Sequence, residues 1–238
     1  MLKKLSLLPF ALLLLIQFST CMPNRSSAEE SDEDNSRENR VPESRKRIEA
    51  LVYKDYLNFL NYRLERSHKI AKDVLADPLM NSINSPAMEE EKNVLKKYVK
   101  ESKEALTIAL PADKNDQQNR FFFALGKDFV LENFNRFNRT RASTTEKLTL
   151  EQKVSWEAMK KHGILEYNRE LELRTNEFVY SIVDGFDNYI KTLTPAEREK
   201  EQELVAVWNR YNKKEVGMDK IEFGQRLFTI FFQYETKA

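Results

Sequence analysis

The chain has 238 residues, of which 41% are hydrophobic and 32% charged, and this favours a water-soluble body over a protein with several membrane-spanning segments. The length suits one domain with a substantial core, or at most two small ones, and the 5 glycines and 7 prolines are too few for the many turns of a β-sandwich or β-barrel. The formal net charge of +1 gives no strong attraction to nucleic acid, so we expect no nucleic-acid partner.

The first residues have the pattern of a leader. Lys3 and Lys4 precede an apolar run over residues 5–16, which Pro9 interrupts. Crossing a bilayer as a helix takes roughly 20 apolar residues, so this run is too short to be a membrane span. A basic start followed by a short apolar run is typical of a signal peptide. The sequence therefore predicts a signal peptide over residues 1–21 and export to the cell envelope.

Phe18-Ser19-Thr20-Cys21 closes this leader, and Cys21 is the only cysteine in the chain. The four residues resemble a lipobox, the processing motif of bacterial lipoproteins, in the looser form of spirochaete-type lipoproteins. The resemblance covers residues 1–21 only, and no family is recognised for the rest of the chain. It implies that Cys21 carries acyl chains, that the leader is removed, and that the protein contacts a membrane through this anchor.

The position after the cysteine bears on the location of the anchor. Met22 stands where an aspartate retains many lipoproteins in an inner membrane, so the resemblance implies the outer membrane or cell surface. The alternative is ordinary cleavage after Ala28, which would give a secreted or periplasmic protein. A catalytic thiol would need a base in a folded pocket, and a disulfide would need a second cysteine, so neither is the preferred role of Cys21.

Residues 22–42 contain six acidic side chains, no aromatic residue and almost no aliphatic one. Such a segment buries too little apolar surface to offset the entropy lost on ordering. We expect it to be a disordered tether between the anchor and the folded part.

From Glu43 onward, apolar residues recur at helical spacing. No segment shows the sustained alternation of a β-strand. We predict an all-α bundle of six or seven helices, forming a single domain over residues 43–238. The predicted helices cover residues 43–75, 86–110, 116–138, a segment opening at 149, and residues 164–193, 194–211 and 218–234.

Local signals define the helix ends. Asp77-Pro78 ends the first helix, because the residue before a proline disfavours helical geometry, and Ser85-Pro86 begins the second. Residues 149–152 and 194–197 are capping boxes that open later helices. His162-Gly163 either ends the helix that opens at residue 149 or only bends it.

The sequence offers few residues with catalytic or metal-binding spacing. Glu65 and His68 lie three residues apart, as in di-iron bundles, but only one other histidine is present. Glu65 should face water, so we interpret this pair as helix surface and expect no metal and no cofactor. Asn168 and Thr175 interrupt the apolar stripe of their helix, and we expect hydrogen bonds within the bundle to satisfy them.

The segment from Arg120 to Arg141 interleaves phenylalanines and arginines. One interpretation is an aromatic and basic surface for an anionic lipid, glycan or nucleic acid. The other, which we favour, is a central helix enclosed by its neighbours, with arginines near its negative end. The residues of the possible binding surface are Phe134, Arg136, Phe137, Arg139 and Arg141.

These observations together predict a lipid-anchored protein of the cell envelope. Nucleotide-binding loops and a hydrolase nucleophile motif are both missing from the sequence, so we expect a non-enzymatic helical module that binds a protein partner or a small ligand. One alternative is an envelope enzyme whose site is not readable from sequence. Another is a purely structural envelope protein.

Overall fold

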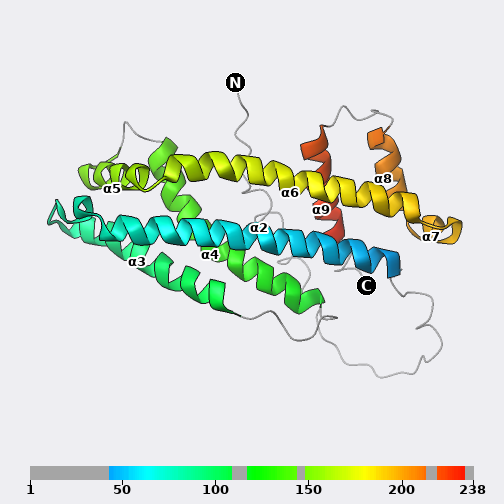
Figure 1. Ribbon diagram of the computed structural model, residues 1–238, viewed down its shortest axis with the longest axis horizontal. Helices are drawn as coiled ribbons and strands as arrows, with labels where there is room; N and C mark the ends of the chain where they lie inside the picture. Colours follow the sequence, from blue (N-terminus) through cyan, green and yellow to red (C-terminus); the bar gives the residue numbers. More distant parts are fainter. Residues whose placement is uncertain (1–42, 109–116, 144–147, 213–218, 234–238) are drawn as a thin grey trace, which may run out of the picture. The chain divides into compact units, whose positions relative to one another are not determined.

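The computed structural model of the chain describes residues 43–108, 117–143, 148–212 and 219–233. All regular structure within these ranges is helical (Figure 1), which confirms the predicted all-α class. The predicted signal peptide with Cys21, and the predicted tether over residues 22–42, lie outside the described residues. In the described ranges, no helix has both the length and the apolar character needed to cross a membrane.

Eight α-helices and one 3-10 helix make up the described part of the chain. The count exceeds six or seven because the segment predicted as one helix from residue 194 is divided at Glu201. The elements are α2 (Glu43–Ala76), η1 (Pro78–Asn81), α3 (Pro86–Thr107), α4 (Gln117–Ser143), α5 (Leu150–Lys161), α6 (Ile164–Thr192), α7 (Pro195–Lys200), α8 (Gln202–Asn212) and α9 (Lys220–Gln233).

The residues predicted to begin helices do so in the structure. The Ser85 side chain accepts a hydrogen bond from the Met88 backbone N–H, with Pro86 at the first helical position of α3. Both capping boxes are formed, with Thr149 opening α5 and Thr194 opening α7. At the junction left open by the sequence, Gly163 adopts φ 89°, so α5 ends and α6 begins as a separate helix.

Contacts divide the chain into two compact units. Unit 1 consists of the described residues of Met1–Asp55 and Asn176–Ala238, and unit 2 is Tyr56–Thr175. The division falls inside α2 and inside α6, so each of these helices contributes residues to both units. The single domain predicted over residues 43–238 stays a prediction.

Aromatic rings form the centre of unit 1. The ring centroid of Phe186 in α6 lies 5.7 Å from Trp208 in α8 and 6.4 Å from Phe223 in α9. Tyr211 stacks on Phe223 at 3.9 Å. Next to these rings α9 approaches α6 so closely that a Cβ atom on Gly224 would lie 2.4 Å from Cγ1 of Val179. Glycine at position 224 therefore allows the close contact between α6 and α9.

The core of unit 2 is centred on Phe134 of α4. Its ring centroid lies 5.0 Å from Tyr98 in α3 and 6.0 Å from Tyr167 in α6. A partly buried ion pair, Arg63 Nη1 to Asp128 Oδ1 at 3.1 Å, joins α2 to α4. Burial acts to lower the pKa of Arg63, but the Asp128 carboxylate together with Tyr167 and Tyr56 outweighs it, so the pKa is raised and the guanidinium stays charged.

Asp77 connects the η1 turn to the end of α5. Its carboxylate accepts hydrogen bonds from the Leu79 backbone N–H at 2.9 Å and from His162 Nε2 at 2.7 Å. Lys161 Nζ lies 2.8 Å from the same carboxylate, whose side chain is 1% exposed. The hydrogen bond from Lys161, followed by those from Leu79 and His162, holds the pKa of Asp77 well below its ordinary value of 3.8.

We predict opposite effects for alanine at two helical glycines. Gly224→Ala should lower the free energy of unfolding, because overpacking costs roughly 1–3 kcal/mol and the gain in helix propensity returns only about 1 kcal/mol. Gly126 is exposed in α4 and a Cβ atom there would meet nothing within 4 Å, so Gly126→Ala should stabilise the protein. Urea denaturation measures the unfolding free energy of both variants. If the two variants unfold at the same urea concentration, the close packing of α9 on α6 is contradicted.

We also predict an acid-dependent role for Asp77. Because its pKa is depressed in the folded state, its charge should stabilise the fold above about pH 4, and this contribution should fall as the pH drops further. The difference in unfolding free energy between the wild type and Asp77→Asn should therefore shrink from pH 5 to pH 2. Asp73→Asn, which removes a carboxylate paired with Lys69 on the helix surface, is the control. A difference that is constant over this pH range would contradict the assignment.

Candidate binding groove between α3 and α4

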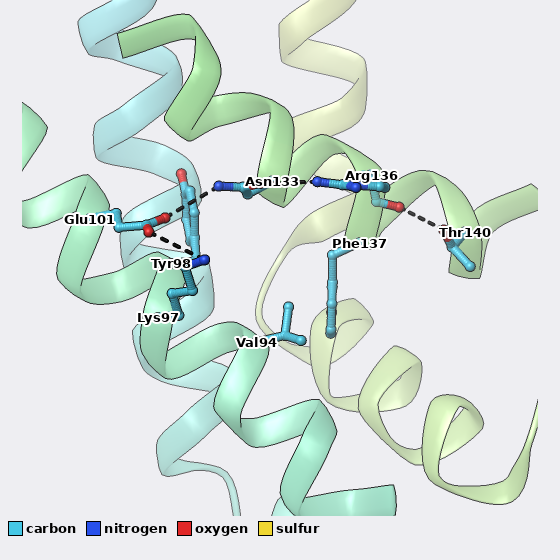
Figure 2. A pocket seen from close by; sticks show the side chains of 8 residues that line it. All are labelled: Val94, Lys97, Tyr98, Glu101, Asn133, Arg136, Phe137 and Thr140. Atoms are coloured by element: carbon cyan, nitrogen blue, oxygen red, sulfur yellow. Dashed lines mark hydrogen bonds and ion pairs between the residues drawn. The ribbon is translucent and has the colours of Figure 1, made fainter. Parts of the chain in front are cut away.

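A groove with a volume of about 340 Å³ lies between α3 and α4 in unit 2. Figure 2 shows its walls, one formed by each helix. Its lining consists of Val94, Lys97, Tyr98 and Glu101 from α3, and of Asn133, Arg136, Phe137 and Thr140 from α4. The volume is at the lower end of the range for sites that hold small molecules.

Helix periodicity brings these side chains together. On α3 the lining positions 94, 97, 98 and 101 follow the spacing of one helix face, and on α4 the positions 133, 136, 137 and 140 do the same. The helices run antiparallel, since Glu101 pairs with Asn133 while Ala105, one turn later, accepts a hydrogen bond from Lys127, an earlier residue of α4. The groove is therefore the surface seam between two packed antiparallel helices.

The floor of the groove is aromatic. Tyr98 is 2% exposed and Phe137 is 5% exposed, so both belong to the core as well as to the groove. The Tyr98 hydroxyl is hydrogen-bonded to the Ser67 hydroxyl in α2. Burial raises the pKa of the Tyr98 phenol well above its ordinary value of 10.0, so the ring stays uncharged. Val94, 43% exposed, extends the apolar surface toward the opening.

A chain of polar contacts forms the rim. Lys97 Nζ lies 3.7 Å from Glu101 Oε1, and Asn133 Nδ2 donates a hydrogen bond to Glu101 Oε2 at 3.2 Å. Arg136 Nη2 donates to Asn133 Oδ1 at 3.1 Å, so Asn133 stands between Glu101 and Arg136 (Figure 2). In the described part of the chain no carboxylate forms an ion pair with Arg136. Two cations and one carboxylate leave the groove with an excess of one positive charge.

The structure distributes the predicted binding-surface residues between core and surface. Arg136 and Phe137 line the groove, and Phe134 lies beneath it, 1% exposed, against Tyr98. Arg139 is exposed and pairs with Glu132 on the same helix. Arg141 is within α4, but its side chain is outside the description.

Sequence reasoning did not identify the α3 wall. Val94, Lys97 and Glu101 have the composition of an ordinary solvated helix surface, and only their position opposite α4 gives them a role. An exposed valine next to the apolar stripe of α3 was the one available signal.

Glu65 and His68, considered as metal ligands on the basis of the sequence, do not line the groove. Glu65 is exposed. His68 Nδ1 lies 2.8 Å from the Ser102 hydroxyl. Burial of His68, together with the nearby charges of Lys72 and Lys103, lowers its pKa. Within the described ranges no group of three or more potential ligands is placed to hold a metal ion.

The two polar interruptions in α6 are satisfied by hydrogen bonds, as expected. Asn168 accepts a bond from Asn138 at 2.8 Å, and the Thr175 hydroxyl donates to the Leu171 carbonyl at 2.7 Å.

Comparison with known proteins found no match to this chain, whether among family models, curated sequences or solved structures. What the groove can bind is therefore judged from its apolar floor, its polar rim and its excess positive charge.

Proposed function

We propose that this chain is a lipid-anchored protein of the cell envelope whose helical part binds a ligand or protein partner and catalyses no reaction. The groove between α3 and α4 is the proposed binding site. The observation that carries this proposal is the position of Arg136, an exposed cation without a carboxylate counter-ion in the described part of the chain, at the edge of an apolar floor. A pocket with an apolar lining and a few placed polar groups is the usual form of a ligand site.

The lining supports binding more than catalysis. Its eight residues include no histidine, cysteine or serine. The Thr140 hydroxyl donates a hydrogen bond to the Arg136 carbonyl at 2.8 Å, and the Tyr98 phenol is kept neutral by burial. Covalent catalysis requires a nucleophile activated by a neighbouring base, and the bonds described for Thr140 and Tyr98, to a backbone carbonyl and to the Ser67 hydroxyl, do not supply one.

Anchoring is the second part of the proposal, and it rests on the leader and Cys21. One acyl chain binds a membrane only marginally, whereas two or more hold it firmly, because each buried methylene contributes about 0.8 kcal/mol. The segment of residues 22–42 would act as a spacer, with a root-mean-square reach of about 25 Å if it behaves as a flexible chain. The location proposed is the outer membrane or cell surface; cleavage after Ala28 would instead give a secreted or periplasmic protein.

The anchor is tested by Cys21→Ser in bacterial cells grown with labelled palmitate. The wild type should incorporate label and partition into the detergent phase, while Cys21→Ser should do neither, because the acylated atom is the cysteine sulfur. Detergent phase separation and label counting measure the two properties. Membrane association by both forms without label in either would contradict lipid anchoring.

The binding site is tested by capture from detergent-solubilised cell envelopes. We predict that Arg136→Glu loses a component that the wild type retains, because it reverses the charge at the rim while the exposed position leaves the core intact. Arg169→Glu is the matched control, since Arg169 is an exposed arginine on α6 that does not line the groove. The proposal fails if no component is captured specifically, or if both variants capture as the wild type does. Circular dichroism confirms that each variant is folded.

A further inference from the structure

We infer that the ligand of the groove is a small amphiphile with one carboxylate and a short hydrocarbon chain. This inference rests on the proposed function, because it names the chemical class bound at the same site. The hydrocarbon chain lies on the aromatic floor, and the carboxylate binds at the rim beside Arg136. Three properties of the described residues lead to this class: the length of the groove, the charge of its rim and its volume.

The length of the groove limits the length of the whole amphiphile. Val94 and Glu101 mark the two ends of the α3 wall, and seven residues of helix rise about 10 Å. An extended chain of about eight carbons has a similar length, given carbon–carbon bonds near 1.5 Å. Val94 and Phe137, on facing walls in Figure 2, offer the tail apolar contacts at the Val94 end of the groove. Because neither side chain has a hydrogen-bonding group, they favour hydrocarbon over a polar chain. The other end, lined by Glu101 and Asn133, is polar and lies beside Arg136, where the head group binds.

The rim sets the charge of the head group. Arg136 uses its Nη2 donor on Asn133, and the planar guanidinium has further N–H donors that can bind a carboxylate at two points. The excess of one positive charge in the groove matches an anion with a single negative charge. Glu101 lies on the same rim and would repel an anion of higher charge, even though Lys97 partly compensates it.

The size of the groove favours a small molecule over a polypeptide. A stable protein–protein interface usually buries at least about 1,000 Å² and needs several anchoring pockets. A groove of about 340 Å³ whose walls are about 10 Å long accommodates one short chain with its head group. A peptide would place only one or two side chains in it.

Sodium octanoate is the probe that tests the inference. The full-length Cys21→Ser chain is used so that neither acyl chains nor detergent compete for the probe. Isotope-labelled protein is titrated, and backbone amide shifts are followed by nuclear magnetic resonance. A ligand of this size should bind with a dissociation constant on the order of a millimolar. The largest shifts should fall on α3 and α4 residues that line the groove.

Variants and analogues separate the contributions of head and tail. Arg136→Gln should weaken octanoate binding about tenfold or more, since it removes a charge-assisted hydrogen bond, whereas Arg169→Gln should not change it. Val94→Asp should also weaken binding, because it places a negative charge on the apolar wall. Acetate, which lacks the chain, and octyltrimethylammonium, which carries the opposite charge, should each bind more weakly than octanoate.

Three outcomes overturn the inference: octanoate causes no shifts in the groove, Arg136→Gln binds it as well as Arg169→Gln does, or octyltrimethylammonium binds equally well. These failures differ from failure of the proposed function. If octanoate does not bind but envelope capture still depends on Arg136, the ligand class is wrong and the binding module stands. If capture does not depend on Arg136, the proposed function itself is wrong, whatever octanoate does.

Discussion

Burial of aromatic rings between helices is the interaction on which each unit of this protein depends. In unit 2 the ring of Phe134 lies between Tyr98 and Tyr167, so one side chain of α4 contacts both α3 and α6. In unit 1 Phe186 has the same role toward the rings of α8 and α9. Such pairs contribute about 0.5–1.5 kcal/mol beyond the area they bury, and their preferred geometry restricts how a helix can rotate about its axis. The orientation of α4, and with it the position of the groove, therefore follows from ring packing.

The groove shares its floor with this core. Tyr98 packs on Phe134 below the groove, and the Ser67 hydroxyl fixes its phenol end. A change in the floor would thus disturb the core, because interiors are packed as densely as organic crystals. The rim is different at Arg136, since its hydrogen bond to Asn133 is exposed, and exposed polar contacts contribute little to stability. Substitutions at Arg136 should therefore affect binding while leaving the fold nearly unchanged.

Local chemistry made the fold class and most helix ends predictable. Ser85, Thr149 and Thr194 cap their helices through contacts within a few residues, which a sequence displays directly. The division between α7 and α8 at Glu201 was not predicted. Buried Glu201 pairs with Arg45 at 3.3 Å, across 156 residues of sequence, and a contact this distant is not displayed by a local pattern. For the same reason, the α4 wall of the groove was predictable and the α3 wall was not. Composition drew attention to Arg136 and Phe137, but the α3 wall depends on the antiparallel register of two helices, which no local pattern encodes.

Specificity at such a groove would come from the head group of a ligand rather than from its tail. If the chain is anchored as proposed, the groove and the bilayer compete for the same amphiphiles. Each methylene gains about 0.8 kcal/mol on leaving water for either environment, so the tail distinguishes poorly between them. The contact between a carboxylate and Arg136 has no equivalent in the hydrocarbon region. Weak affinity is also sufficient there, because anchoring confines protein and ligand to the same surface and raises their effective concentration. The charge of the rim, at the edge of an aromatic floor, is then the feature by which this protein would select what it binds.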